Sequence, residues 1–199
     1  MKPWTLGFLA SHRGTNMQAI IDACTDGRLN AKPAVVISNN GESQALDRAM
    51  AAGIPAYHMS SRNFPDPEAL DRAITEALQK HQVNLVLLAG YMKRVGPRTL
   101  AAFPGRIINI HPALLPRYGG KGMYGTNVHE AVIASGDRET GITIHQVDEN
   151  YDGGNVLAQR KVPVRTEDTA QSLADRMLPL EHELYVGTLE RIFSGEIKL

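Results

Sequence analysis

Short runs of β-branched and apolar residues alternate with amphipathic stretches of helix length, and this alternation limits the fold more than any other feature. The apolar runs lie at residues 4–10, 33–38, 54–59, 84–90 and 106–110. A first helix-length stretch begins at about residue 15, and the others lie at 43–53, 67–81 and 97–103. Strands separated by helices form βαβ units, in which helices cover both faces of a parallel sheet. The sequence therefore predicts an α/β fold with a mostly parallel central sheet.

The C-terminal part follows a different pattern. After an irregular segment rich in glycine and proline, a helix is predicted at 127–135, and the alternating runs 141–148 and 155–164 are able to pair as a hairpin. Residues 166–193 read as a closing helix, with Thr166 or Asp168 as its expected N-cap and Pro179 as a possible kink. A loop rich in glycine and proline inside a compact domain is more often functional than incidental.

Length and composition narrow the class of protein. The 199 residues fit one domain, 1–199, and show no linker or repeat. A net charge of zero gives no basic field for nucleic acid or membrane. Without a signal peptide or a spanning segment, we expect a cytoplasmic protein, either monomer or homodimer, acting on small molecules.

The single cysteine, Cys24, excludes an intramolecular disulfide and a cysteine-rich zinc site. It continues the helical spacing of Met17, Ile20 and Ile21, so we expect it on the packed face as a small core residue. The histidines show no metal-ligand spacing, and no metal is expected. Among them, His145 precedes the Asp152 loop on a strand and is the one expected near the site.

A first candidate binding loop, "SHRGTN", joins the first strand to the first helix. Gly14 permits a tight turn, and the free N–H groups near Thr15 and Asn16 lie at the positive end of the helix dipole, where phosphate binds well. Arg13 and the Thr15 hydroxyl are able to add to such a site. The pattern matches neither a dinucleotide-binding nor a Walker loop, so a capped helix with a glycine turn stays open as the alternative.

A second candidate site lies in "IINIHPALLPR", where Asn109 and His111 share one face at the end of a buried strand. Strand carboxyl ends are where ligands gather in open α/β sheets. The Asn amide and a protonated His are two donors that together are able to hold a developing oxyanion. The alternative, that both side chains only satisfy loop backbone groups, remains open on these residues alone.

The segment "DENYDGG" begins like a calcium loop, with Asp148, Asn150, Asp152 and Gly153 in the expected order. The twelfth position, however, is Gln159 where a bidentate Glu is needed, and both flanks read as strands. A glycine turn that presents Asp152 is the better interpretation. A carboxylate beside His111 would favour the imidazolium and is able to move protons.

Taken in order, "SHRGTN", "LLAGYMKRV", "NIHPALLPRYGG", "GITIHQVDENYDGG" and "EHELY" resemble one family, the folate-dependent phosphoribosylglycinamide formyltransferases of purine biosynthesis. The resemblance extends from about Leu6 to Tyr185. It implies a Rossmann-like formyltransferase fold and transfer of a formyl group from 10-formyltetrahydrofolate, the co-substrate, to the amine of glycinamide ribonucleotide. The "NIHPALLP" and "DGG" elements fix only the wider superfamily, while the "GTN" loop and the short length select this member.

The resemblance also assigns roles to individual residues. Asn109 and protonated His111 would stabilise the tetrahedral oxyanion, and Asp152 would hold the histidine charge and assist proton transfer. The resemblance further implies that the N-terminal half binds nucleotide or phosphate and that the C-terminal half carries catalysis and binds folate. Glycinamide ribonucleotide would contact Gly14, Thr15, Asn16 and Glu181, and folate would contact Met92, Lys93, Arg94, Val95, Asn109, Asp148 and Asp152.

Some residues depart from the family's pattern. His12 and Arg13 stand where Gly or Asn is common, Pro67 stands where Arg is common, and the segment Lys121–Val128 is longer than in many members.

Three alternative functions remain. A formyltetrahydrofolate deformylase shares the triad, a methionyl-tRNA formyltransferase has an added basic domain, and a nonenzymatic nucleotide-binding module would use Asn109 and His111 only to brace a loop.

Overall fold

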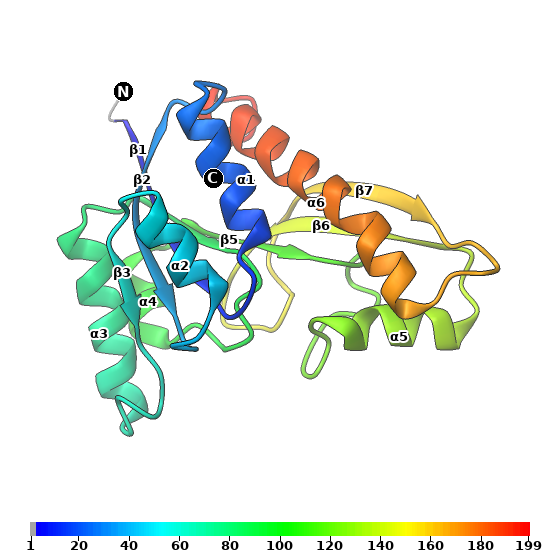
Figure 1. Ribbon diagram of the computed structural model, residues 1–199, viewed down its shortest axis with the longest axis horizontal. Helices are drawn as coiled ribbons and strands as arrows, with labels where there is room; N and C mark the ends of the chain where they lie inside the picture. The colour runs from blue at the N-terminus through cyan, green and yellow to red at the C-terminus, as the bar shows by residue number, and fades with distance from the viewer. Residues whose placement is uncertain (1–2) are drawn as a thin grey trace. The chain divides into compact units, whose positions relative to one another are not determined.

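The computed structural model describes residues 3–199 (Figure 1). Seven strands form a sheet in the order β3-β2-β1-β4-β5-β6-β7. The chain divides into two compact units, the first reaching Ile108 and the second running from Asn109 to Lys198, so that the boundary falls within β5. The strands are β1 Trp4–Ala10, β2 Ala31–Ser38, β3 Ala56–His58, β4 Leu85–Leu88, β5 Ile107–His111, β6 Glu139–Gln146 and β7 Val156–Pro163.

The first unit is a parallel sheet in which β1 pairs with β2 and with β4, and β2 pairs with β3. Every residue from Leu6 to Ala10 is buried, so side chains pointing to either face of β1 are covered. One face meets helix α3, Pro67–Lys80, because a Cβ added at Gly7 would lie 2.6 Å from a methyl carbon of Leu78. The predicted parallel sheet with helices on both faces is confirmed.

Four helices belong to this unit: α1 Thr15–Thr25, α2 Gln44–Ala51, α3 Pro67–Lys80 and α4 Pro97–Ala102. The start of α3 shows why the sequence folds this way locally. The Asp66 side chain accepts hydrogen bonds from the backbone N–H groups of Glu68 and Ala69, and Pro67 occupies the first turn, where its missing N–H costs nothing. Pro67 therefore has a structural reason to stand at this position.

The second unit contains α5 Thr126–Ser135, the antiparallel pair β6 and β7, and α6 Ala170–Phe193, which packs alongside both strands (Figure 1). The predicted hairpin pairing is confirmed. The expected N-cap of α6 was wrong, because Thr169 caps the helix through a reciprocal pair of bonds with Ser172. Asp168 instead pairs with Arg176, and α6 continues through Pro179 as one helix.

None of the helices within residues 3–199 is long and apolar enough to cross a membrane. Cys24 is half-buried on α1, and burial, with a smaller contribution from Asp26, raises the pKa of its thiol to about 11. A thiol with so high a pKa is a poor nucleophile at neutral pH. The interpretation of 1–199 as one domain stays a prediction.

Candidate active site

The end of β5 presents the two side chains that the sequence singles out. Ile107, Ile108 and Ile110 are buried and hold the strand in the core, while Asn109 is partly exposed and His111 is only 3% exposed. Asn109 and His111 are two residues apart on a strand, so their side chains leave the same face. Both belong to the second compact unit.

His111 has a defined partner at each ring nitrogen. Its Nε2 lies 2.7 Å from the backbone carbonyl oxygen of Tyr118, and its Nδ1 lies 3.7 Å from a carboxylate oxygen of Asp152. A carbonyl oxygen only accepts, so Nε2 carries a hydrogen and donates it. The nitrogen that faces Asp152 is therefore the one free to gain or lose a proton.

Asp152 lies between two imidazoles. One carboxylate oxygen is 3.7 Å from His111 Nδ1 and accepts the Gly120 backbone N–H at 2.9 Å, and the other is 3.5 Å from Nε2 of His145. Asp152 itself has a left-handed backbone with φ 53°. Such a conformation is uncommon outside glycine, and Asp is among the residues that tolerate it.

The double glycine after Asp152 also has a steric reason. A Cβ on Gly154 would lie 1.9 Å from the carbonyl oxygen of Gln146, so only glycine fits. That same carbonyl lies 2.8 Å from Nδ1 of His145. The "DGG" turn thus brings Asp152 and the end of β6 together.

His145 is the site residue left out of the predicted catalytic set, although its place on the strand before the Asp152 loop was a signal. It is 2% exposed, and burial lowers its pKa, opposed by the Gln146 carbonyl and Asp152. The neutral ring donates Nδ1–H to Gln146, so Nε2 accepts from the Asn109 amide at 3.1 Å. One amide hydrogen of Asn109 is thereby fixed, and the other remains for a ligand.

A further histidine, His129, lies on α5 and is 5% exposed. Burial, with a smaller contribution from His111, lowers its pKa below the ordinary 6.5. Its Nδ1 is buried without a hydrogen-bond partner in the described part of the chain. His129 therefore stays neutral and adds no positive charge beside His111.

The predicted phosphate loop lies in the first unit, at the start of α1. Gly14 has φ 65°, and a Cβ there would lie 2.8 Å from Ala45, so the turn requires glycine. Thr15 is partly exposed and opens the helix, and no side-chain cap occupies its N-terminus. The first turn of a helix is a place where an anion binds well, because it lies at the positive end of the helix dipole.

The predicted folate segment, Met92 to Val95, is tied to the phosphate loop by Ser11. The Ser11 hydroxyl accepts the Met92 N–H at 2.8 Å and donates to Asn39 at 2.6 Å, while its backbone N–H donates to Gly90. Lys93 and Arg94 are exposed and Val95 is buried. The structure brings these two predicted binding segments together within the first unit.

The remaining predicted contacts lie in the second unit. Glu181 is partly exposed on α6, and Asp148 is exposed and accepts the Asn150 N–H at 2.7 Å. Gln159 sits on β7 and donates to the Leu115 carbonyl and the Thr143 hydroxyl, as a strand residue and not as a metal ligand. No cluster of metal-ligating side chains occurs between residues 3 and 199.

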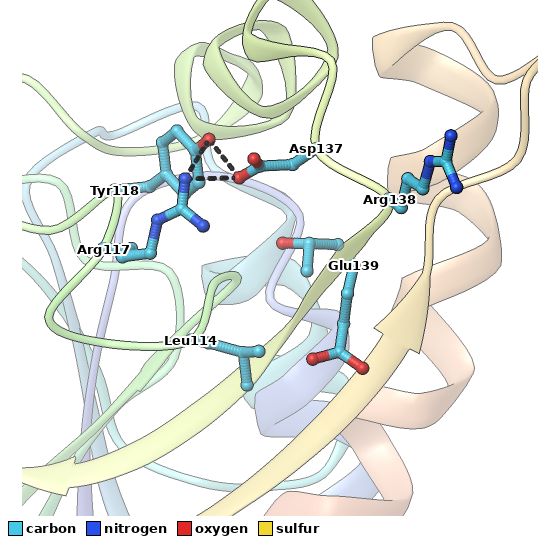
Figure 2. Close-up of a pocket in the computed structure, with 7 residues that line it drawn as sticks. Leu114, Arg117, Tyr118, Asp137, Arg138 and Glu139 are labelled. Atoms are coloured by element: carbon cyan, nitrogen blue, oxygen red, sulfur yellow. Dashed lines mark hydrogen bonds and ion pairs between the residues drawn. The ribbon is translucent and has the colours of Figure 1, made fainter.

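Tyr118 also lines a cavity of about 390 Å³ (Figure 2). The Tyr118 hydroxyl bonds to the Asp137 carboxylate at 2.5 Å, and Arg117 pairs with the same carboxylate at 2.7 Å. The sequence did not identify Tyr118, because it contacts His111 through its backbone carbonyl, a group that every residue type has. The lining residues are Leu114, Arg117, Tyr118, Asp137, Arg138, Glu139 and Thr140.

Residues 6–189 match the family model described as formyl transferase. The chain belongs to the formyl transferase family. It is 40% identical over 194 residues to a phosphoribosylglycinamide formyltransferase of Haemophilus influenzae, covering 98% of this chain and 89% of that protein. The predicted resemblance is thus confirmed.

Solved structures agree with this placement. The crystal structure of glycinamide ribonucleotide transformylase 1 from Symbiobacterium toebii superposes with a TM-score of 0.93 at 38% identity, covering 99% of this chain and 91% of that one. A chloroplastic phosphoribosylglycinamide formyltransferase of Arabidopsis thaliana is 41% identical over 97% of this chain. The chain spans only 66% of the length of that plant relative.

Proposed function

We propose that the protein transfers the formyl group of 10-formyltetrahydrofolate to the amine of glycinamide ribonucleotide, a step of purine biosynthesis. The observation that carries this proposal is the approach of Asp152 to His111, together with the bond of Asn109 to His145, in a formyl transferase chain. Such a set offers hydrogen-bond donors and a carboxylate base on one surface. These are the groups that attack of an amine on a formyl carbon requires.

In the proposed reaction the substrate amine forms a bond to the formyl carbon, and the formyl oxygen becomes an oxyanion. The free amide hydrogen of Asn109 and a proton on His111 Nδ1 stabilise that oxygen. The amine's proton passes to Asp152, directly or through water. The oxyanion then reforms the carbonyl, the bond from carbon to N10 of the folate breaks, and N10 takes up the proton that Asp152 received, giving tetrahydrofolate and the formylated ribonucleotide.

His145 contributes by orientation in this scheme. Its Nε2 accepts one Asn109 amide hydrogen at 3.1 Å, which fixes the rotation of the amide and points the second hydrogen to the ligand. Because burial lowers its pKa, His145 remains the neutral acceptor that this bond requires. Orientation before reaction is the main source of oxyanion stabilisation by such donors.

The two substrates are proposed to bind as the family resemblance implies. The phosphate of glycinamide ribonucleotide would rest on Gly14, Thr15 and Asn16, with Glu181 on its ribose. This placement is supported by the position of these residues at the first turn of α1, where the helix dipole favours an anion. The folate would lie along Met92, Lys93, Arg94 and Val95 and beside Asp148. A cytoplasmic location and a monomeric or homodimeric state complete the proposal.

A folate absorbance assay with purified protein tests the reaction. Signal is expected only with both 10-formyltetrahydrofolate and glycinamide ribonucleotide present. Tetrahydrofolate release without the ribonucleotide would instead identify a formyltetrahydrofolate deformylase. Absence of signal with both substrates, under conditions where each binds, would leave only a binding module and refute formyl transfer.

A further inference from the structure

We propose that Tyr118 is a positioning residue whose backbone carbonyl holds His111 as the Nε2–H tautomer. This inference rests on the proposed function, because it explains which nitrogen of His111 takes part in it. The carbonyl lies 2.7 Å from Nε2, while Nδ1 faces Asp152 at 3.7 Å. In the other neutral tautomer Nε2 would have no hydrogen, and two lone pairs would face each other across 2.7 Å.

The conformation of Tyr118 needs support from outside the loop. Its φ is 56°, in the left-handed region that costs a residue with a Cβ about 1–2 kcal/mol. A non-glycine residue keeps such a backbone only when surrounding contacts hold it there. The next two residues, Gly119 and Gly120, do not restrict the loop through side chains, so the Tyr118 side chain is the natural anchor.

That anchor is the contact of Tyr118 with Asp137 and Arg117 (Figure 2). The Tyr118 hydroxyl bonds to Asp137 at 2.5 Å and to the Ser135 hydroxyl at 2.6 Å, and Arg117 pairs with Asp137 at 2.7 Å. The Tyr118 and Arg117 hydrogen bonds lower the pKa of Asp137, so the carboxylate is charged at neutral pH. Tyr118 thus spans two sites, with its phenol on Asp137 and its carbonyl on His111.

The consequence for the reaction is a fixed direction of proton exchange. With Nε2–H committed to the carbonyl, a proton enters and leaves His111 only at Nδ1, on the side of Asp152. A loop free to move would let the ring share its hydrogen between both nitrogens, and part of the population would present the wrong one. We expect the phenol anchor to matter for kcat and not for substrate affinity.

The tautomer is read directly by long-range ¹H–¹⁵N NMR of protein labelled at histidine, at a pH where the rings are neutral, with His111 signals assigned from a His111→Gln spectrum. The wild-type ring should show the Nε2–H pattern. Tyr118→Phe and Asp137→Ala should show admixture of the other tautomer, and Asp137→Asn, which keeps an acceptor oxygen, should show less. Tyr57→Phe is the matched control, because it also removes a phenol bond, to His81 at 3.0 Å.

Kinetics complete the test. Tyr118→Phe and Asp137→Ala should lower kcat by about tenfold, near the low end for removing the partner that orients a functional histidine, with both KM values almost unchanged. An Nδ1–H ring in the wild type, or a fall in kcat without any change of tautomer, would overturn the proposal. If the wild type transfers no formyl group but shows the Nε2–H ring, the proposed function fails while the tautomer assignment stands.

Discussion

The two amide hydrogens of Asn109 have different partners in the proposed reaction. One amide hydrogen is bonded to His145 Nε2 at 3.1 Å, and the other is the one proposed to bind the formyl oxygen. Asn109→Ala is therefore expected to lower kcat by about a hundredfold to a thousandfold, the range for losing one oxyanion donor. Steady-state kinetics measure the loss. Asn63→Ala, which removes an exposed amide bonded to Ser60, is the control and should keep full activity.

Buried histidines give the stability of the fold a definite dependence on pH. Burial, with a smaller contribution from His111, lowers the pKa of His129 below its ordinary 6.5, so below that pH the unfolded chain takes a proton that the native state resists. The unfolded state then binds more protons, and stability falls as pH falls, by up to about 1.4 kcal/mol per pH unit for one histidine.

The variant His129→Gln should reduce that slope below pH 6.5 by up to about 1.4 kcal/mol per pH unit, the contribution of one proton. Urea unfolding at a series of pH values measures the slope. His12→Gln, at an exposed position, is the comparison. An equal slope in wild type and His129→Gln would show that His129 binds its proton equally well in both states. The slope itself is the readout, because the substitution also changes packing in α5.

At the scale of elements, a carboxylate on α3 holds the start of α4. Asp71 is 8% exposed and accepts the Arg98 N–H at 2.7 Å, the Thr99 N–H at 3.1 Å and the Thr99 hydroxyl at 2.5 Å. The segment Met92–Val95 runs directly into this turn. Asp71 therefore caps a helix from outside it and fixes where the proposed folate segment ends.

Asp71→Ala leaves these donors without their acceptor and should lower the free energy of unfolding by about 3 kcal/mol, the upper range for bonds to a charged group. Urea unfolding measures it. Asp71→Asn retains one acceptor oxygen and should lose less, and Asp26→Ala, which removes an exposed ion pair with Arg28, should lose at most about 1 kcal/mol. Equal stability of Asp71→Ala and wild type would remove Asp71 as the support of α4.

The elements themselves were predictable from periodicity, because βαβ units place strong apolar runs between amphipathic helices. The N-cap of α6 was not, since Thr166, Asp168 and Thr169 are all good caps and only the packing of the helix selects one. Asn109, His111 and Asp152 were singled out by their types and positions, but only the family resemblance joined them into a catalytic set, and their roles stay predictions. Tyr118 was beyond reach, because its backbone carbonyl makes the contact.

At the scale of the whole molecule, the residues proposed for phosphate binding and those proposed for catalysis belong to different compact units. Gly14, Thr15 and Asn16 belong to the first, while Asn109, His111 and Asp152 belong to the second. Binding residues that contact a remote phosphate act equally on ground and transition states, whereas oxyanion donors act mainly on the transition state. Substitutions in the two units should therefore change different kinetic constants.

Thr15→Val separates them, because it removes one hydroxyl at the start of α1 and keeps the side-chain shape. Losing a hydrogen bond to a charged phosphate, about 1.5 kcal/mol, should raise KM for glycinamide ribonucleotide about tenfold and leave kcat and KM for the folate unchanged. Thr25→Val, the same substitution at the other end of α1, removes only a bond to the Ile21 carbonyl and should change neither constant. A fall in kcat with constant KM would show that Thr15 acts in the catalytic step, and it would contradict the proposed assignment of phosphate binding and catalysis to different residues.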